Sequence, residues 1–265
     1  MPTVFRFLVA LFILTGGTVW ADDVLFIGNS FTFADQAPVI QQHGGVPKLF
    51  EAIARAKGHD VTAYAVTAPG KPWAYHLAQP RTKEMFDSRA WTWVVLQDYS
   101  TRPTRIDDVK QFLADGMTFS RWIAGKSPHG GIVLYETWAR PPGAFYAQPP
   151  GNAFPNPAAM LDDLHHNYGQ LRDLLAKGNP GRPARIALVG TAFARCKAEH
   201  PEIILDAKDA HHASPAGYYL AALVMDATMY HESVLGAPAT FFDDAQVFSA
   251  NEAAAMQTVA DEVTR

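Results

Sequence analysis

A serine near the start of the chain and a histidine near its end are residue types that nucleophilic catalysis uses. Ser30 directly follows an apolar run of strand length, and Asp209 precedes His212 by three residues. A serine hydroxyl is a poor nucleophile at neutral pH, so it needs a base within hydrogen-bonding reach, and that base needs an orienting group. Histidine suits the role of base because its pKa lies near neutral pH. The sequence therefore predicts acyl transfer with Ser30 as nucleophile, His212 as base and Asp209 as the orienting acid.

Neighbouring residues offer alternatives for these roles. His211 could act as the base in place of His212, and Asp206 could orient it in place of Asp209. The spacing between Asp209 and His212 favours that pair, because the carboxylate can then accept a hydrogen bond from a ring nitrogen. Ser30 could also be only a turn residue or a helix cap, which is a frequent use of serine after a strand.

Acyl transfer also needs hydrogen-bond donors that hold the developing negative charge on the substrate oxygen. The backbone N–H groups of Ser30 and Gly70 are candidates for this oxyanion hole. Gly70 suits the role because glycine lets a substrate approach the backbone closely. The side-chain amide of Gln97 is the third candidate, since Gln97 follows another strand-like run.

Three further side chains are candidates for lining a substrate pocket. Trp138 and Arg140 come directly after a short apolar run, and Trp73 follows shortly after Gly70. Packing in the core would explain the two tryptophans equally well, and a surface ion pair would explain Arg140.

Strand-like and helix-like segments alternate along the chain. Apolar runs and helical spacing predict strands at 24–27, 61–66, 93–96, 132–135 and 186–189, and helices at 46–57, 106–124, 158–175, 215–230 and 251–263. The start of the helix at 215 is marked by Ser214 as N-cap and Pro215 at the first helical position. The proline-rich segment 141–157 is predicted to be a long surface loop beside the site.

This alternation predicts an α/β fold with a five-stranded, mainly parallel sheet and helices on both of its faces. Parallel strands direct their carboxyl ends to one edge, and ligands bind at that edge in open α/β sheets. Ser30, Gly70 and Gln97 each follow a different predicted strand, and the loop 209–212 precedes a helix whose start can approach the same edge. Topology alone therefore predicts that these residues converge on one site.

Two segments of the chain resemble the first and last sequence blocks of the SGNH (GDSL-like) hydrolase superfamily. The first is Gly28-Asn29-Ser30-Phe31-Thr32, and the second is Asp209-x-x-His212 followed by Ser214-Pro215-x-Gly217-Tyr218. The first block is most similar to a bacterial branch that has Gly-Asn-Ser-Phe-Thr in place of Gly-Asp-Ser-Leu. The resemblance implies a three-layer flavodoxin-like fold across the mature chain. It also implies esterase or acylhydrolase activity without a cofactor, with Ser30, His212 and Asp209 in the roles given above and Gly70 donating its backbone N–H.

The third block departs from the superfamily pattern. The superfamily usually has Gly-x-Asn-Asp after the third strand, with the asparagine amide in the oxyanion hole, whereas this chain has Leu96-Gln97-Asp98. Gln97 carries the same amide on a longer side chain, so it is the predicted substitute.

Composition excludes several classes of partner and site. The 265 residues carry a formal net charge of −4 and contain no run of basic residues, so neither nucleic acid nor an anionic membrane is an expected partner. Cys196 is the only cysteine, so no intramolecular disulfide and no cysteine cluster for zinc can form. The histidine pairs at 165–166 and 211–212 lack the spacing of metal ligands, so no metal site is predicted.

Residues 1–21 have the features of a secretory signal peptide. Arg6 supplies a positive charge, residues 7–14 are apolar, and small residues precede position 22. The apolar run is short for a transmembrane span, which makes an uncleaved membrane anchor the weaker alternative. We predict that residues 22–265 form one exported domain, periplasmic or secreted, without stable membrane insertion after cleavage.

The predicted function is that of an exported serine esterase acting on a small-molecule or carbohydrate ester, with an O-acetyl group as the suggested acyl group. Two other functions are compatible with the same sequence. A catalytically silent glycan-binding protein could have this fold, since a fold does not determine function. An acyltransferase would use the same three residues but exclude water.

Overall fold

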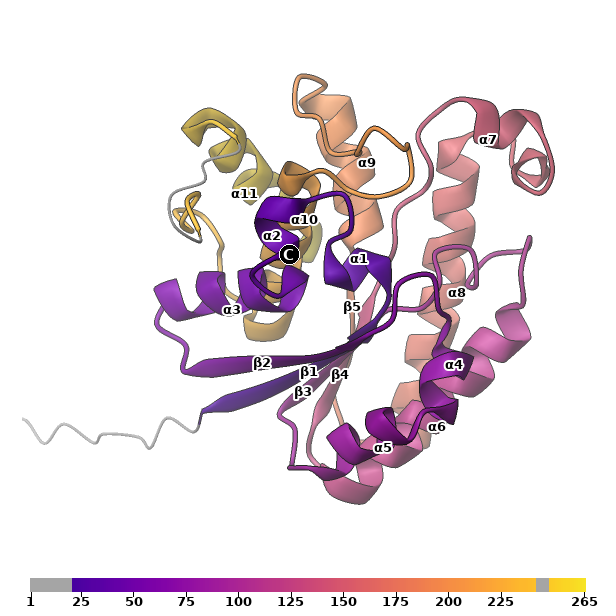
Figure 1. Cartoon of the computed structure of the whole chain (residues 1–265), viewed down its shortest axis with the longest axis vertical. Coiled ribbons are helices and arrows are strands. Elements are labelled where there is room, and N and C mark those ends of the chain that lie inside the picture. Colours follow the sequence, from indigo (N-terminus) through magenta and orange to yellow (C-terminus); the bar gives the residue numbers. More distant parts are fainter. Residues whose placement is uncertain (1–20, 242–247) are drawn as a thin grey trace, which may run out of the picture.

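A five-stranded parallel sheet lies at the centre of the molecule, with its strands in the order β2-β1-β3-β4-β5 (Figure 1). The computed structural model describes residues 21–241 and 248–265. Most of the predicted signal peptide, residues 1–20, therefore lies outside the described residues. The strands are β1 (Asp22–Gly28), β2 (Val61–Thr67), β3 (Trp93–Leu96), β4 (Gly131–Tyr135) and β5 (Ala184–Ala187). The predicted flavodoxin-like α/β fold with five parallel strands is confirmed.

Helices cover both faces of the sheet and give three layers (Figure 1). Val24 and Phe26 of β1 face one apolar cluster, whereas Leu25 and Ile27 face the other, so the strand is buried on both sides. The first face packs against α3 (Gly45–Ala56), α9 (Val189–Glu199), α10 (Pro215–Tyr230) and α11 (Ala250–Thr264). The second packs against α4 (Trp73–Ala78), α5 (Pro80–Asp87), α6 (Val109–Lys126) and α8 (Pro157–Gly178).

Short helices complete the described part of the chain. They are α1 (Ser30–Phe33), α2 (Pro38–Gln41), α7 (Ala144–Ala147) and a single 3-10 turn (Gly151–Ala153). The last two lie within the proline-rich segment predicted to be a loop. No helix in the described ranges is long and apolar enough to cross a membrane.

The predicted fifth strand is shifted by two residues from the one observed. β5 ends at Ala187, and α9 begins at Val189, so Gly190, which follows the predicted strand in sequence, lies in a helix. A Cβ atom at position 190 would collide with the backbone carbonyl of Thr137. Gly190 therefore allows α9 to approach the segment after β4, and a single sequence could not reveal this long-range contact.

The strand order reverses between β1 and β3, and this reversal positions the candidate site. Both strands run parallel, with Ile27 opposite Leu96, so Ser30 and Gln97 follow adjacent strands at the same edge. In flavodoxin-like sheets this reversal is where ligands bind.

The predicted start of α10 is also confirmed, because the Ser214 side chain accepts a hydrogen bond from the third residue of the helix.

Candidate active site

The turn that carries Ser30 is held by contacts between the first and third sequence blocks. Gln97 Oε1 accepts hydrogen bonds from the backbone N–H of Asn29 at 2.9 Å and from the Thr32 hydroxyl at 3.0 Å. A Cβ atom at Gly28 would collide with that hydroxyl, so glycine is required there. Thr32 and Gln97 therefore form one structural unit with Gly28. The hydrogen bonds to Gln97 Oε1 give a physical reason for a glutamine in the third block. The sequence alone predicts Gln97 only as a substitute oxyanion donor.

A buried histidine supports the same turn from within the core. His76 Nε2 lies 2.9 Å from the backbone carbonyl of Gly28, and the side chain is only 1% exposed. A carbonyl oxygen only accepts hydrogen bonds, so Nε2 carries the proton. Burial lowers the pKa of His76 and keeps the ring neutral, and the hydrogen bond to Gly28 offsets only part of this effect. The sequence alone gives no sign of this role, because His76 and Gly28 are 48 positions apart.

The Asp209 carboxylate and the His212 ring form the predicted pair. His212 Nδ1 lies 2.6 Å from Asp209 Oδ2, and Asp209 Oδ1 accepts the backbone N–H groups of His211 and His212 at 3.0 Å each. Burial opposes ionisation of Asp209, but the hydrogen bonds from His212 outweigh it and lower the pKa of the carboxyl group. The carboxylate is therefore ionised at neutral pH and fixes the imidazole with Nε2 free for another partner.

The two alternatives raised by the sequence, Asp206 and His211, have contacts different from those of Asp209 and His212. The Asp206 carboxylate pairs with the ammonium of Lys197 at 2.7 Å. The backbone carbonyl of His211 accepts the indole N–H of Trp138 at 3.2 Å, and its ring Nδ1 is buried without a partner among the described residues. The geometry thus joins Asp209 to His212. No cluster of three or more histidine, cysteine or acidic side chains suited to a metal ion occurs within 21–241 and 248–265.

The first and last sequence blocks lie side by side in space. The ring of Phe31, the residue after Ser30, lies 5.6 Å from the ring of His212 and 5.0 Å from that of His211. Phe31 also stacks on Trp138 at 4.1 Å. Segments separated by about 180 positions in the sequence therefore meet at the carboxyl edge of the sheet. Ser30 itself is 7% exposed at the start of α1.

The other two predicted oxyanion donors are the Gln97 side-chain amide and the Gly70 backbone N–H, and their surroundings differ. Gln97 Nε2 donates to the backbone carbonyl of Asp98, so one of its two amide hydrogens already has a partner. Gly70 has a φ of +70°, and no atom lies within 4 Å of the position that a Cβ would occupy. The backbone at Gly70 is therefore open to an approaching group.

The three predicted lining residues have different environments. Trp73 is fully buried and stacks on Phe112 at 5.1 Å, so it packs in the core, which is the alternative that the sequence left open. Trp138 is sandwiched between Phe31 and Phe193, yet it contributes to the wall of a cavity. Arg140 lines that cavity and also a second one.

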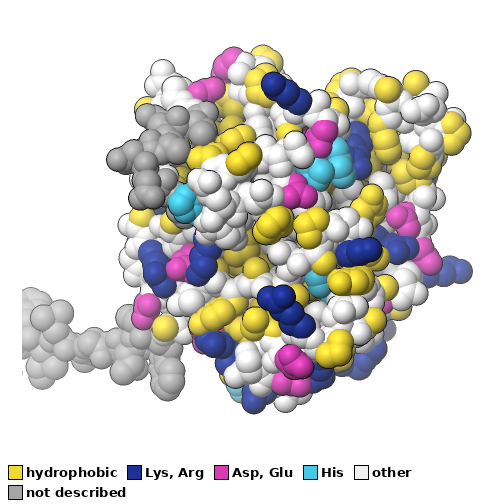
Figure 2. All heavy atoms as spheres, in the orientation of Figure 1, with side chains coloured by type: hydrophobic (Ala, Val, Ile, Leu, Met, Phe, Trp, Pro, Cys, Tyr) yellow, Lys and Arg dark blue, Asp and Glu magenta, His cyan; other side chains and the backbone are white. Residues whose placement is uncertain are grey.

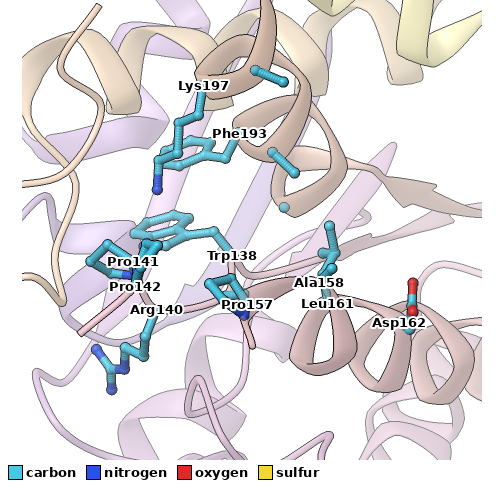
Figure 3. A pocket seen from close by; sticks show the side chains of 14 residues that line it. Trp138, Arg140, Pro141, Pro142, Pro157, Ala158, Leu161, Asp162, Phe193 and Lys197 are labelled. Atoms are coloured by element: carbon cyan, nitrogen blue, oxygen red, sulfur yellow. The ribbon is translucent and has the colours of Figure 1, made fainter. Parts of the chain in front are cut away.

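Two cavities adjoin the segment that follows β4. The first, of about 390 Å³, is walled mainly by apolar side chains of that segment, α8 and α9, including Trp138, Pro157, Leu161 and Phe193 (Figure 3). The second, of about 300 Å³, lies between residues 140–145 and residues 209–211. The proline-rich segment therefore forms one wall of a cavity whose other wall contains Asp209.

A fully buried carboxyl group, Asp98, is expected to make the stability of the protein depend on pH. Asp98 Oδ1 accepts the backbone N–H groups of Trp73 and Tyr99 at 2.7 Å each, whereas Oδ2 has no partner among the described residues. Burial raises the pKa of Asp98 from its ordinary value of 3.8 to about 7. Between these values the folded protein binds more protons than the unfolded chain, so this group makes stability fall as pH rises.

We expect the wild-type protein to lose roughly 2 kcal/mol of unfolding free energy relative to Asp98→Asn between pH 5 and pH 8. Denaturant unfolding of both proteins across this range measures the difference. The comparison isolates Asp98 because every other ionisable group is present in both proteins. A constant difference across the range would show that Asp98 does not titrate there.

Comparisons with solved structures identify proteins of similar architecture. A DUF4886 family protein from Bacteroides uniformis matches with a TM-score of 0.69 and 17% identity over 92% of this chain and 94% of that chain. TesA matches with a TM-score of 0.55 and 13% identity, covering 81% of this chain and 100% of its own. A member of the lipolytic protein G-D-S-L family from Veillonella parvula gives 0.52 and 14%, covering 79% and 98%.

A scan of protein-family models and a search of curated proteins found no match to this chain. The TM-scores show a shared fold, whereas sequence identities this low do not show a shared chemistry. The described chain therefore has the α/β fold of the GDSL-type lipolytic proteins and of the DUF4886 protein.

Proposed function

We propose that the protein is an exported serine hydrolase that cleaves esters through an acyl-enzyme intermediate. One observation carries the proposal: the His212 ring is bonded to Asp209 at 2.6 Å and lies against Phe31, the neighbour of Ser30. A fixed imidazole next to a serine at the edge of a parallel sheet is the arrangement that activates a hydroxyl nucleophile. Export is proposed from the N-terminal segment of the sequence.

The proposed reaction has two symmetrical halves. Ser30 Oγ attacks the ester carbonyl carbon while His212 Nε2 accepts the hydroxyl proton, and Asp209 stabilises the imidazolium that forms. The tetrahedral intermediate collapses, the C–O bond to the alcohol breaks, and His212 returns the proton to the leaving oxygen. Water then attacks the acyl-Ser30 carbonyl with the same proton transfers and releases the acid.

The proposed oxyanion hole consists of the Ser30 and Gly70 backbone N–H groups and the second amide hydrogen of Gln97. The hydrogen bonds from Asn29 and Thr32 to Gln97 Oε1 fix the orientation of its amide, which supports a preorganised donor. The open surroundings of Gly70 support the approach of a substrate oxygen there.

The proposed substrate is an ester with a small acyl group, for example an O-acetyl group on a carbohydrate. The apolar cavity beside Trp138, lined by proline and aromatic side chains, suits the nonpolar face of such a molecule (Figure 3). Secretion would bring the enzyme to extracellular or periplasmic glycans.

Hydrolysis of p-nitrophenyl acetate tests the proposed function. We expect a burst of nitrophenol equal to the enzyme concentration, followed by slower turnover, because acylation and deacylation are separate steps. A protein that binds acetylated sugars but releases nitrophenol no faster than buffer would instead be a glycan-binding protein. Product analysis with an added sugar acceptor separates hydrolysis from acyl transfer.

A further inference from the structure

Arg140 is a half-buried guanidinium that lacks a carboxylate partner within the described part of the chain. The hydrogen bond that its side chain makes there is a long one, 3.4 Å, to the Ser100 hydroxyl. The guanidinium also lies over the ring of Phe145, with its central carbon 5.5 Å from the ring centroid. By contrast, Arg102 and Arg105 pair with aspartates at 2.8 and 2.9 Å. The positive charge of Arg140 is thus available to a ligand.

The position of Arg140 places this charge beside the candidate catalytic groups. Arg140 follows β4 at the carboxyl edge of the sheet and lines the cavity of about 300 Å³ together with Asp209 and His211. Its contact with Ser100 ties it to the segment after β3. Two residues earlier, Trp138 stacks on Phe31.

Neighbouring acidic groups do not neutralise this charge by direct pairing. Both oxygens of Asp209 are already occupied, one by the His212 ring and the other by two backbone N–H groups. Burial lowers the pKa of Arg140, while Tyr99, Asp209 and Tyr146 act in the opposite direction. A guanidinium nevertheless remains charged at all working pH values, so its partial burial without an ion pair costs free energy that a bound anion would recover.

We propose that Arg140 determines specificity by binding an oxyanion group of the substrate, a carboxylate, sulfate or phosphate, close to the scissile ester. This inference rests on the proposed esterase function and names the substrate class of the same site. The guanidinium presents a planar fork of donors that matches such groups. In Figure 3 the Arg140 guanidinium points away from the apolar cavity, whereas Trp138 and Phe193 point toward it. On the face in Figure 2, histidine side chains near the loop between α9 and α10 have both acidic and basic side chains beside them.

Matched aryl acetates test the proposal directly. The substrates are 4-acetoxybenzoate, 4-acetoxybenzenesulfonate and the neutral 4-acetoxybenzamide, and kcat/KM is measured for each with wild type, Arg140→Gln and Arg140→Lys. We expect wild type to prefer at least one anion over the amide by about tenfold or more in kcat/KM. A hydrogen bond to a charged group contributes enough binding free energy for a preference of that size. Arg140→Gln should abolish the preference by lowering kcat/KM for the anions to that for the amide, and Arg140→Lys should restore part of the preference.

Arg172→Gln is the matched control, because Arg172 is exposed and pairs with its neighbour Asp173 at 2.7 Å. It should retain the full preference. Preference for the carboxylate or for the sulfonate identifies which oxyanion geometry the site accepts. Equal rates for the anions and the amide in wild type, or a preference that survives in Arg140→Gln, would overturn the proposal while leaving the esterase function intact.

Binding provides a readout that does not depend on turnover. Calorimetric titration of Ser30→Ala with 4-acetoxybenzoate and 4-acetoxybenzenesulfonate should show tighter binding of at least one anion than of the amide. The added Arg140→Gln substitution should remove that difference. If neither wild type nor any variant with Ser30 intact hydrolyses any of the esters, the proposed function fails. Equal affinities of Ser30→Ala for the anions and the amide would separately overturn the role of Arg140.

Discussion

The Ser30→Ala substitution is expected to reduce kcat for p-nitrophenyl acetate by about 10³-fold or more. Removal of the hydroxyl eliminates the covalent route, and the residual rate would come from the oxyanion donors and substrate binding alone. The variant should also lose the initial burst of nitrophenol, because no acyl-enzyme can form. Stopped-flow absorbance measures both quantities on the same sample.

The fold should tolerate this substitution. Ser30 begins α1, where the side chain of Asn29 caps the helix by accepting the N–H of Phe31. The backbone carbonyl of Ser30, which alanine retains, accepts the N–H of Asp35. Thermal unfolding should therefore be close to that of wild type. A stable Ser30→Ala protein that keeps more than about a tenth of the wild-type rate would be incompatible with a serine nucleophile at this position.

The paired substitutions His212→Ala and His211→Ala are expected to have very different effects. His212→Ala removes the proposed base, so kcat/KM should fall by about 10³-fold or more at neutral pH. His211→Ala leaves the Asp209–His212 pair in place, and its backbone carbonyl still accepts the Trp138 indole. Its rate should stay within about fivefold of wild type, since the change is limited to local packing.

These adjacent histidines act as matched controls because both rings contact Phe31. A loss of local packing would therefore affect both variants, whereas loss of the base affects only one. The opposite pattern, with His211→Ala inactive and His212→Ala active, would reassign the base and remove the role proposed for Asp209.

Much of the fold could be predicted because β1, β3 and β4 contain short apolar runs that are buried on both faces. The runs at 93–96 and 215–230 coincide with β3 and α10, since strong burial and a clear helix start leave little ambiguity. The meeting of the Phe31 and His212 rings agrees with the predicted topology, since parallel strands direct their carboxyl ends to one edge.

Contacts between distant segments could not be predicted in the same way. The link from Gln97 to Thr32 and Asn29 joins side chains more than 60 positions apart, and no local pattern encodes it. Trp73 resembles a pocket residue in sequence, but an aromatic cluster on α6 buries it. Gly190 directly follows the predicted fifth strand in sequence, but it lies in α9, where close packing against the Thr137 carbonyl accounts for the glycine.

Covalent labelling with a fluorophosphonate probe tests most directly whether Ser30 and His212, from opposite ends of the chain, form one nucleophilic centre. The Ser30 oxygen would displace fluoride from phosphorus, and His212 would accept the hydroxyl proton. Mass spectrometry of the digested protein should locate one adduct on Ser30, and labelling should be strongly slowed in His212→Ala. An adduct on another residue, or ester hydrolysis that persists in a protein the probe does not modify, would contradict this assignment.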